Sequence, residues 1–191
     1  MRTFGLDPAK RTILIVGGSL GARTLNESMM QAWEVLKEAD VQCIWQTGKY
    51  YHAAITESLK GRELPNVHVC DFISDMDAAY AAADLVISRA GAGSISEFCL
   101  LGKAVILVPS PNVAEDHQTK NALALVNKKA ALYVRDADAP LQLMPLALMT
   151  VANENTLQEL RTNILTLAHH HSAEVIADEV LSLAAAYRAK K

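Results

Sequence analysis

Short apolar runs alternate with amphipathic segments over residues 12 to 134, and this alternation limits the possible folds more than any other feature of the chain. The run at 12–16 is rich in β-branched residues and ends at Gly17-Gly18, which is typical of a strand buried on both faces of a parallel sheet. From 22 to 38, apolar residues recur at helical spacing. This order predicts an α/β fold, a doubly wound parallel sheet of about six strands with right-handed crossovers.

The remaining elements follow the same logic. We expect strands at 41–45, 66–70, 85–87, 104–108 and 131–134, and helices at 22–38, 50–59, 75–83, 95–101 and 117–129. From Pro140 onward only helices are expected, with breaks near Asn153 and near the three histidines that begin at His169. The prediction is one domain over 1–191, with a sheet region at about 12–134 and C-terminal helices at about 139–188.

Composition excludes several classes of protein. Hydrophobic residues make up 51% of the 191 residues, enough for a sizeable core, and the net charge of −3 with scattered Lys and Arg argues against a nucleic-acid partner. Cys43, Cys70 and Cys99 lack paired spacing, which indicates buried thiols in a reducing compartment. The chain begins without an apolar signal segment and has no apolar run near the ~20 residues of a membrane span, so we expect a soluble, cytoplasmic domain.

The ten residues from Ser88 to Glu97 are the strongest candidate site. They follow an apolar run, and a helix is expected to begin near Ile95, so the amides of Ala92, Gly93 and Ser94 would face outward at a helix N-terminus that attracts phosphates. Glu97 is expected in the first turn, where a carboxylate can accept hydrogen bonds from both hydroxyls of a ribose.

A structural explanation competes with this one. Ser94-x-x-Glu97 has the spacing of a capping box, in which the glutamate binds backbone amides instead of a ligand. The neighbouring run of small residues, which would let phosphates approach the backbone, favours the ligand. The hypothesis is a nucleotide-sugar site.

A second small-residue turn spans 17–21. It does not match a dinucleotide-binding motif, because Ser19 and Ala22 break the glycine register and no acidic residue follows the second strand at Gln46-Thr47. A Gly-Lys-Ser or Gly-Lys-Thr phosphate loop is also absent from the sequence. The amides of this turn and the Ser19 hydroxyl are suited to phosphate, and a turn needed only for packing explains the glycines equally well.

Metal sites are weakly supported. Asp75 and Asp77, like Asp136 and Asp138, resemble a metal-binding Asp-x-Asp pair, but this spacing is common by chance and Asp75 is better explained as a helix N-cap. The histidines at 169–171 lack the i, i+4 spacing of helical zinc ligands. We expect no metal and no cofactor.

The polar residues 115–118 follow the fifth expected strand. Acidic residues at a helix start are explained by the helix dipole, while their side chains can also hydrogen-bond sugar hydroxyls. We favour a ligand role for Gln118 over a purely structural one, and the opposite for Glu115.

Four motifs, at 17–23, 71–76, 88–97 and 117–121, occur in the order found in a known family. With them the chain resembles, from residue 12 to about 188, the C-terminal half of the MurG family, the bacterial UDP-N-acetylglucosamine (UDP-GlcNAc) transferases that make lipid II. The resemblance implies the Rossmann-like, donor-binding half of a two-domain GT-B glycosyltransferase that uses no metal. Arg2 matches the end of an interdomain Asn-Pro-Val-Arg motif.

The resemblance also implies roles for individual residues. The backbone of Ile73 would hold the uracil edge with Phe72 beside it, Glu97 would take the ribose hydroxyls, and Gln118 would meet the sugar. The diphosphate would lie against the small residues of both turns. His117 stands where the family often has Gln, and Gly93 replaces a larger residue. The implied donor-binding set is Ser19, Phe72, Ile73, Ala92, Gly93, Ser94, Glu97, His117 and Gln118.

In the intact family the reaction is an inverting transfer of GlcNAc from UDP-GlcNAc to lipid I, for peptidoglycan synthesis, cell division and cell shape. The general base and the lipid I site belong to the N-terminal acceptor domain, so we expect no catalytic residue in this chain, no transfer by it alone, and an intact enzyme peripheral on the cytoplasmic face of the inner membrane. Three alternatives stay open: a standalone donor subunit similar to that of the two-chain GlcNAc transferase of the dolichol pathway, a non-catalytic UDP-sugar-binding module, and half of a UDP-GlcNAc 2-epimerase.

Overall fold

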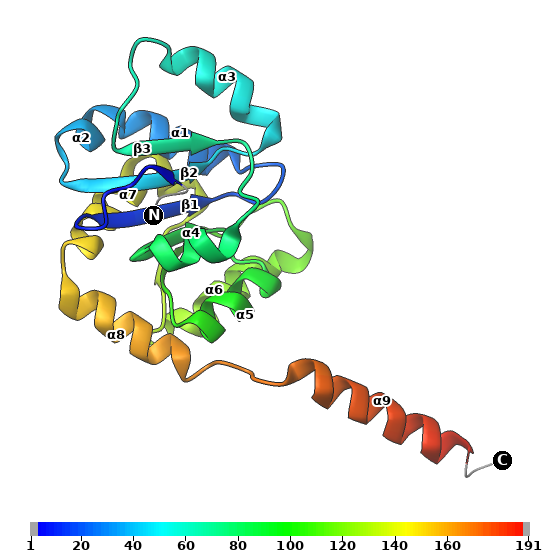
Figure 1. The fold of residues 1–191 in the computed structure, drawn as a ribbon. Helices are drawn as coiled ribbons and strands as arrows, with labels where there is room; N and C mark the ends of the chain where they lie inside the picture. Colours follow the sequence, from blue (N-terminus) through cyan, green and yellow to red (C-terminus); the bar gives the residue numbers. More distant parts are fainter. Residues whose placement is uncertain (1–3, 189–191) are drawn as a thin grey trace.

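The computed structural model describes residues 4–188, so Arg2 lies outside the described residues. Six strands form one parallel sheet in the order β3-β2-β1-β4-β5-β6. Figure 1 labels β1, β2 and β3, which lie side by side. The doubly wound, Rossmann-like sheet predicted from the sequence is therefore confirmed. The strands are β1 (Arg11–Val16), β2 (Val41–Gln46), β3 (Val67–Cys70), β4 (Leu85–Ser88), β5 (Ala104–Leu107) and β6 (Leu132–Tyr133).

Helices connect the strands and complete the chain. They are α1 (Arg23–Gln31), α2 (Trp33–Glu38), α3 (Lys49–Leu59), α4 (Met76–Ala82), α5 (Ala92–Leu101), α6 (His117–Val126), α7 (Ala139–Val151), α8 (Glu154–Leu165) and α9 (Ser172–Arg188), with short 3-10 turns at Ala114–Asp116 and Asp136–Asp138.

The single helix expected over 22–38 is wrong. The chain leaves helical geometry at Ala32, where ψ is 2°, and divides into α1 and α2. The Trp33 indole N–H donates to Arg62 O at 2.8 Å, which ties the start of α2 to the loop before β3. Apolar spacing continues across the break, so periodicity alone could not show it.

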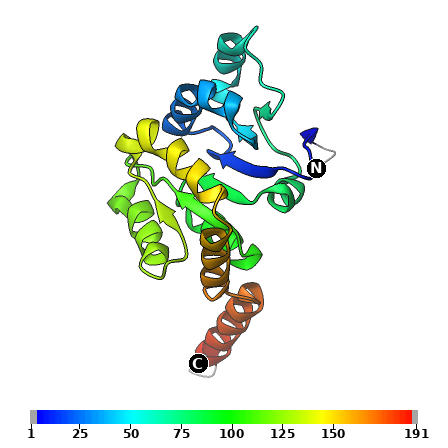
Figure 2. The same ribbon diagram turned by 90° about the vertical axis from the view of Figure 1, so that its left-hand side faces the viewer.

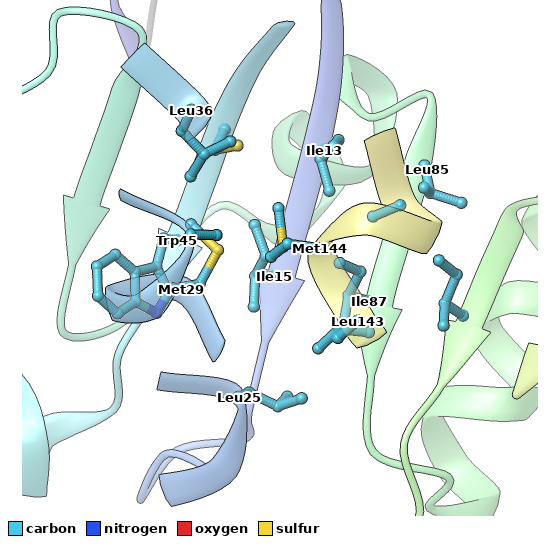
Figure 3. Close-up of a cluster of buried hydrophobic side chains, with 14 of the residues drawn as sticks. Ile13, Ile15, Leu25, Met29, Leu36, Trp45, Leu85, Ile87, Leu143 and Met144 are labelled. Atoms are coloured by element: carbon cyan, nitrogen blue, oxygen red, sulfur yellow. The ribbon is translucent and has the colours of Figure 1, made fainter. Parts of the chain in front are cut away.

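Alternate residues of each strand enter two separate cores. On one face, Ile13 and Ile15 of β1 pack with Trp45 of β2 and with the apolar sides of α1, α2 and α7 (Figure 3). On the other face, Leu14 joins a cluster from α4, α5 and α6. Because both faces are covered, the strands are apolar at nearly every position, as the sequence runs indicated.

Two helix ends agree with the sequence. Asp75 caps α4, its side chain accepting from Ala78 N–H at 3.0 Å. Gly102 ends α5 in the left-handed region at φ 61°, and Lys103 N–H donates back to Phe98 O at 3.0 Å.

The C-terminal helices also form as expected, with breaks at Asn153 and at residues 169–171. The last of them, α9, extends away from the rest of the molecule (Figures 1 and 2). Its apolar stripe, which includes Ile176, Val180 and Leu181, is exposed. Within residues 4–188, no helix combines the length and hydrophobicity that crossing a bilayer requires.

The glycine turn after β1 packs against the end of β2. Gly21 has φ 86°, and a Cβ at this position would lie 2.1 Å from Thr47 O. A Cβ at Gly48 would lie 2.1 Å from Gly21 N, so two backbones meet where no side chain fits. Packing therefore accounts for Gly21 whether or not the turn binds a ligand.

We expect Gly21→Ala to lower the free energy of unfolding by about 3 kcal/mol or more, because it adds a backbone clash to an unfavourable φ. Gly61→Ala is the matched control: Gly61 has φ 72° with open space around it, so its substitution should cost about 1 kcal/mol. Urea unfolding of both variants checks this, and equal losses would contradict the packing argument.

Candidate functional site

The carboxyl ends of β1 and β4 meet at the point where the chain changes face. After β1 it turns into α1 on one face of the sheet, and after β4 into α5 on the other face. In open α/β sheets, ligands bind in the crevice at this reversal. Both small-residue turns singled out in the sequence lie at this edge.

Helix α5 begins at Ala92, three residues before the expected Ile95. Gly91 is the N-cap in extended geometry, and the first helical hydrogen bond runs from Ile95 N–H to Gly91 O at 3.0 Å. The amides of Ala92, Gly93 and Ser94 therefore precede the ladder and have no earlier helical carbonyl. The first turn of α5 consists of small residues without the periodic spacing of apolar side chains. The sequence pattern could therefore not locate the start of this helix.

Glu97 consequently lies in the second turn of α5, not the first, and the capping box is wrong because Gly91 holds the cap position. Instead, the Tyr80 hydroxyl of α4 donates to Glu97 Oε2 at 2.8 Å. Glu97 is exposed, so the rest of its carboxylate is open to a ligand. The carboxylate is thus held in place by a neighbouring helix.

Tyr80 is itself fixed by packing. Its ring contacts Phe98 edge to face, with centroids 5.9 Å apart, and is buried among apolar side chains. Burial, and then the hydrogen bond and negative charge of Glu97, raise the pKa of Tyr80 well above its usual 10.0. Tyr80 therefore stays neutral at physiological pH and donates to Glu97, a contact that the sequence did not predict.

Phe72 and Ile73 follow β3 on the same edge. Ile73 is buried in the cluster that contains Tyr80, whereas Phe72 is 49% exposed with Lys49 Nζ 5.6 Å from its ring centroid. An exposed aromatic face beside a buried aliphatic residue is suited to stacking against a flat ring.

A cleft of about 610 Å³ lies between the β1–α1 turn and the loops that follow β4 and β5. Gln118 of α6 lines it, and its Oε1 accepts from Ser110 N–H at 2.9 Å and from Ala90 N–H at 3.3 Å. The oxygen is thereby committed to joining the two loops. Only the side-chain NH₂ of Gln118 is left to meet a ligand, as a donor.

Arg89 forms the most buried charge of this cleft. Its guanidinium donates to Val108 O at 3.0 Å and to Pro109 O at 3.2 Å and pairs with Asp136, whose other oxygen accepts from Thr24 Oγ1 at 2.9 Å. From the sequence, Asp136 was considered only as a metal ligand, and this network was not predicted. An arginine placed directly after a buried strand at the ligand edge was the available signal.

The expected site residues fall into separate groups. Ser19 is exposed on the glycine turn, and Gln118 lines the cleft beside that turn. His117 is exposed and donates from Nδ1 to Ala114 O at 2.9 Å. The cleft lining does not include His117, Glu97 or the pair at 72–73, which lie elsewhere along the same edge.

The described residues hold no cluster of three or more His, Cys, Asp or Glu side chains that could bind a metal ion. All three cysteines are free. Burial raises the pKa of Cys43 to about 12 and that of Cys70 to about 11, so neither thiol forms a nucleophilic thiolate at neutral pH.

The sheet order and the two turns at its switch point place this chain in the class of Rossmann-like α/β domains. Within that class, the Glycosyltransferase family 28 C-terminal domain matches residues 12–182, and the chain belongs to this family.

Relatives agree with this assignment. The UDP-N-acetylglucosamine--N-acetylmuramyl-(pentapeptide) pyrophosphoryl-undecaprenol N-acetylglucosamine transferase of Bacteroides fragilis is 65% identical over 96% of this chain and 49% of that protein. The transferase of the same name from Cytophaga hutchinsonii is 51% identical over 94% of this chain and 48% of its own length. The chain thus spans about half the length of the curated relatives it matches.

A solved structure is also similar. MurG of Acinetobacter baumannii is 33% identical and superposes with a TM-score of 0.78 over 91% of this chain and 50% of that chain. The resemblance to the C-terminal half of the MurG family is confirmed.

The Tyr80–Glu97 pair predicts a pH dependence of stability. Above about pH 10 the unfolded chain releases the Tyr80 proton while the folded chain keeps it, so stability falls as pH rises toward the raised pKa. Tyr80→Phe removes this contribution. The free energy of unfolding should therefore fall less steeply with pH in the variant than in wild type, and the two slopes should differ by about 1.4 kcal/mol per pH unit.

Urea unfolding at about pH 9 and about pH 11 measures this difference. Tyr50→Phe is the control, because Tyr50 is 80% exposed and its replacement should leave the wild-type slope. An unchanged slope in Tyr80→Phe would show that Tyr80 ionises alike in the folded and unfolded chain.

Proposed function

We propose that residues 1–191 form the single UDP-sugar-binding domain of an inverting glycosyltransferase. The intact enzyme transfers GlcNAc from UDP-GlcNAc to lipid I to make lipid II, at the cytoplasmic face of the inner membrane. The observation that carries this proposal is the start of α5, where three amides without an acceptor among residues 4–188 lie one turn before a carboxylate held by Tyr80. Membership of family 28 and 65% identity to the Bacteroides fragilis transferase support it.

The proposed donor lies along the carboxyl edge of the sheet. Its diphosphate rests against Ser19 and the amides of Ala92, Gly93 and Ser94, and its ribose hydroxyls bind Glu97. The uracil stacks near Phe72 and binds the backbone of Ile73. The sugar extends toward Gln118, whose NH₂ donates to a hydroxyl oxygen, with His117 beside it. The exposure of Glu97 and Phe72 and the cleft at Gln118 support this arrangement.

The chemistry is divided between two domains. As the bond from sugar to UDP breaks, negative charge grows on the departing diphosphate, and the amides at the start of α5 stabilise it. The acceptor hydroxyl of lipid I needs a general base, which we assign to the N-terminal acceptor domain. This chain therefore supplies donor binding and leaving-group stabilisation but no base.

We expect the chain to bind UDP-GlcNAc and Glu97→Ala to weaken binding at least about tenfold, through loss of charge-assisted bonds to the ribose. Isothermal titration calorimetry with UDP-GlcNAc measures both. Glu159→Ala is the matched control and should bind as wild type does. Glu159 is an exposed carboxylate on α8, and Arg161 of this helix pairs with Asp84 just before β4, at the edge opposite the ligand edge.

The same chain, incubated with UDP-GlcNAc and lipid I, should form no lipid II until the acceptor domain is added. No binding heat at millimolar ligand, or wild-type affinity in Glu97→Ala, would contradict the site. Binding without transfer even after addition of the acceptor domain would favour a non-catalytic binding module.

A further inference from the structure

Gln46, the last residue of β2, is a buried polar side chain that no role described so far uses. It is 4% exposed, and its Nε2 donates to Gly18 O, in the glycine turn, at 3.1 Å. Its Oε1 is buried without a hydrogen-bond partner among residues 4–188. A buried amide oxygen without a partner is unfavourable, so the fold alone would favour an apolar residue here.

The hydrogen bond fixes the direction of a peptide plane. Gly18 O also accepts from Gly21 N–H at 2.9 Å, so two donors hold this carbonyl against the protein. In a planar trans peptide the following N–H points the opposite way, which directs the Ser19 amide outward. Among the described residues, none accepts a hydrogen bond from Ser19 N–H. Gly18 has φ 84° and no side chain to resist a flip of this peptide.

We propose that Gln46 is a positioning residue that orients the Ser19 amide toward the diphosphate of a bound nucleotide. The inference rests on the proposed function and adds a residue that does not touch the ligand itself. A 180° rotation of the Gln46 amide would exchange Oε1 and Nε2. Oε1 would then face Gly18 O, and two hydrogen-bond acceptors would repel each other. The unpartnered oxygen is the consequence of keeping the donor at Gly18.

Gln42 provides an internal control. It lies on the same strand and the same face, is equally buried at 3% exposure, but is at the opposite end of β2. Both ends of its amide are satisfied: Oε1 accepts from Asp7 N–H at 3.0 Å, and Nε2 donates to Asp7 O at 2.7 Å and Thr12 Oγ1 at 3.0 Å. Gln42 therefore serves the fold alone.

The test is an NMR titration of the ¹⁵N-labelled chain with UDP and with uridine, which lacks the diphosphate. In wild type, UDP should shift the Ser19 amide downfield and uridine should not. Gln46→Met should lose the Ser19 shift and bind UDP about tenfold more weakly, with uridine affinity unchanged. Gln42→Met should lower stability and leave the ratio of UDP to uridine affinity as in wild type.

Each other outcome has a definite meaning. An unchanged ratio in Gln46→Met, or equal losses for both ligands, overturns the positioning role and leaves the proposed function standing. Failure of wild type to bind UDP overturns the proposed function and this inference with it. If Gln46→Met does not show the native spectrum, Gln46→Asn replaces it, because the shorter Asn amide does not reach Gly18. The ratio of UDP to uridine affinity in that variant then tests the positioning role.

Discussion

All six strands run parallel, so every strand-to-helix turn of the sheet lies at one edge, and the rest of the site depends on this constraint. β1 and β4 are neighbours, and the helices that follow them pack on opposite faces of the sheet. The turns after these strands therefore diverge, and the chain topology itself forms a crevice between them. The side chains around the crevice then determine only what it can bind. Small residues leave the backbone of both turns accessible, and Gln118 of α6 and Arg89 line the cleft beside the first turn.

Contacts that do not themselves need a ligand join the segments around the crevice. Arg89 and Asp136 join the end of β4 to the loop after β6, and Gln118 joins the loops after β4 and β5. Removing one partner of the Arg89–Asp136 pair would leave a mostly buried charge unpaired, which is strongly destabilising. Preorganised amides bind an anion without the cost of first ordering them, so under the proposed function these contacts serve donor binding as well as the fold.

The sequence could predict what depends on neighbours along the chain. Apolar runs located the strands, Asp75 its helix start and Gly102 its helix end, since each acts within a few residues. The sequence could not predict contacts between distant segments. Tyr80 and Glu97 are 17 residues apart, and Arg89 and Asp136 are 47 residues apart. The start of α5 was misplaced because small residues have no periodic signal.

The division between donor and acceptor domains has a kinetic consequence under the proposed function. Amides aimed at the diphosphate contact it in the bound donor and in the transition state, but the charge they face grows as the sugar departs. Their orientation therefore contributes more to the rate of transfer than to donor affinity. Glu97, in contrast, binds ribose hydroxyls whose charge does not change, so it contributes alike to both states. Under the proposed function, the two parts of the binding edge therefore have different roles. Glu97 contributes mainly to nucleotide affinity, and the amides of Ser19 and α5 contribute mainly to the departure of UDP from the sugar.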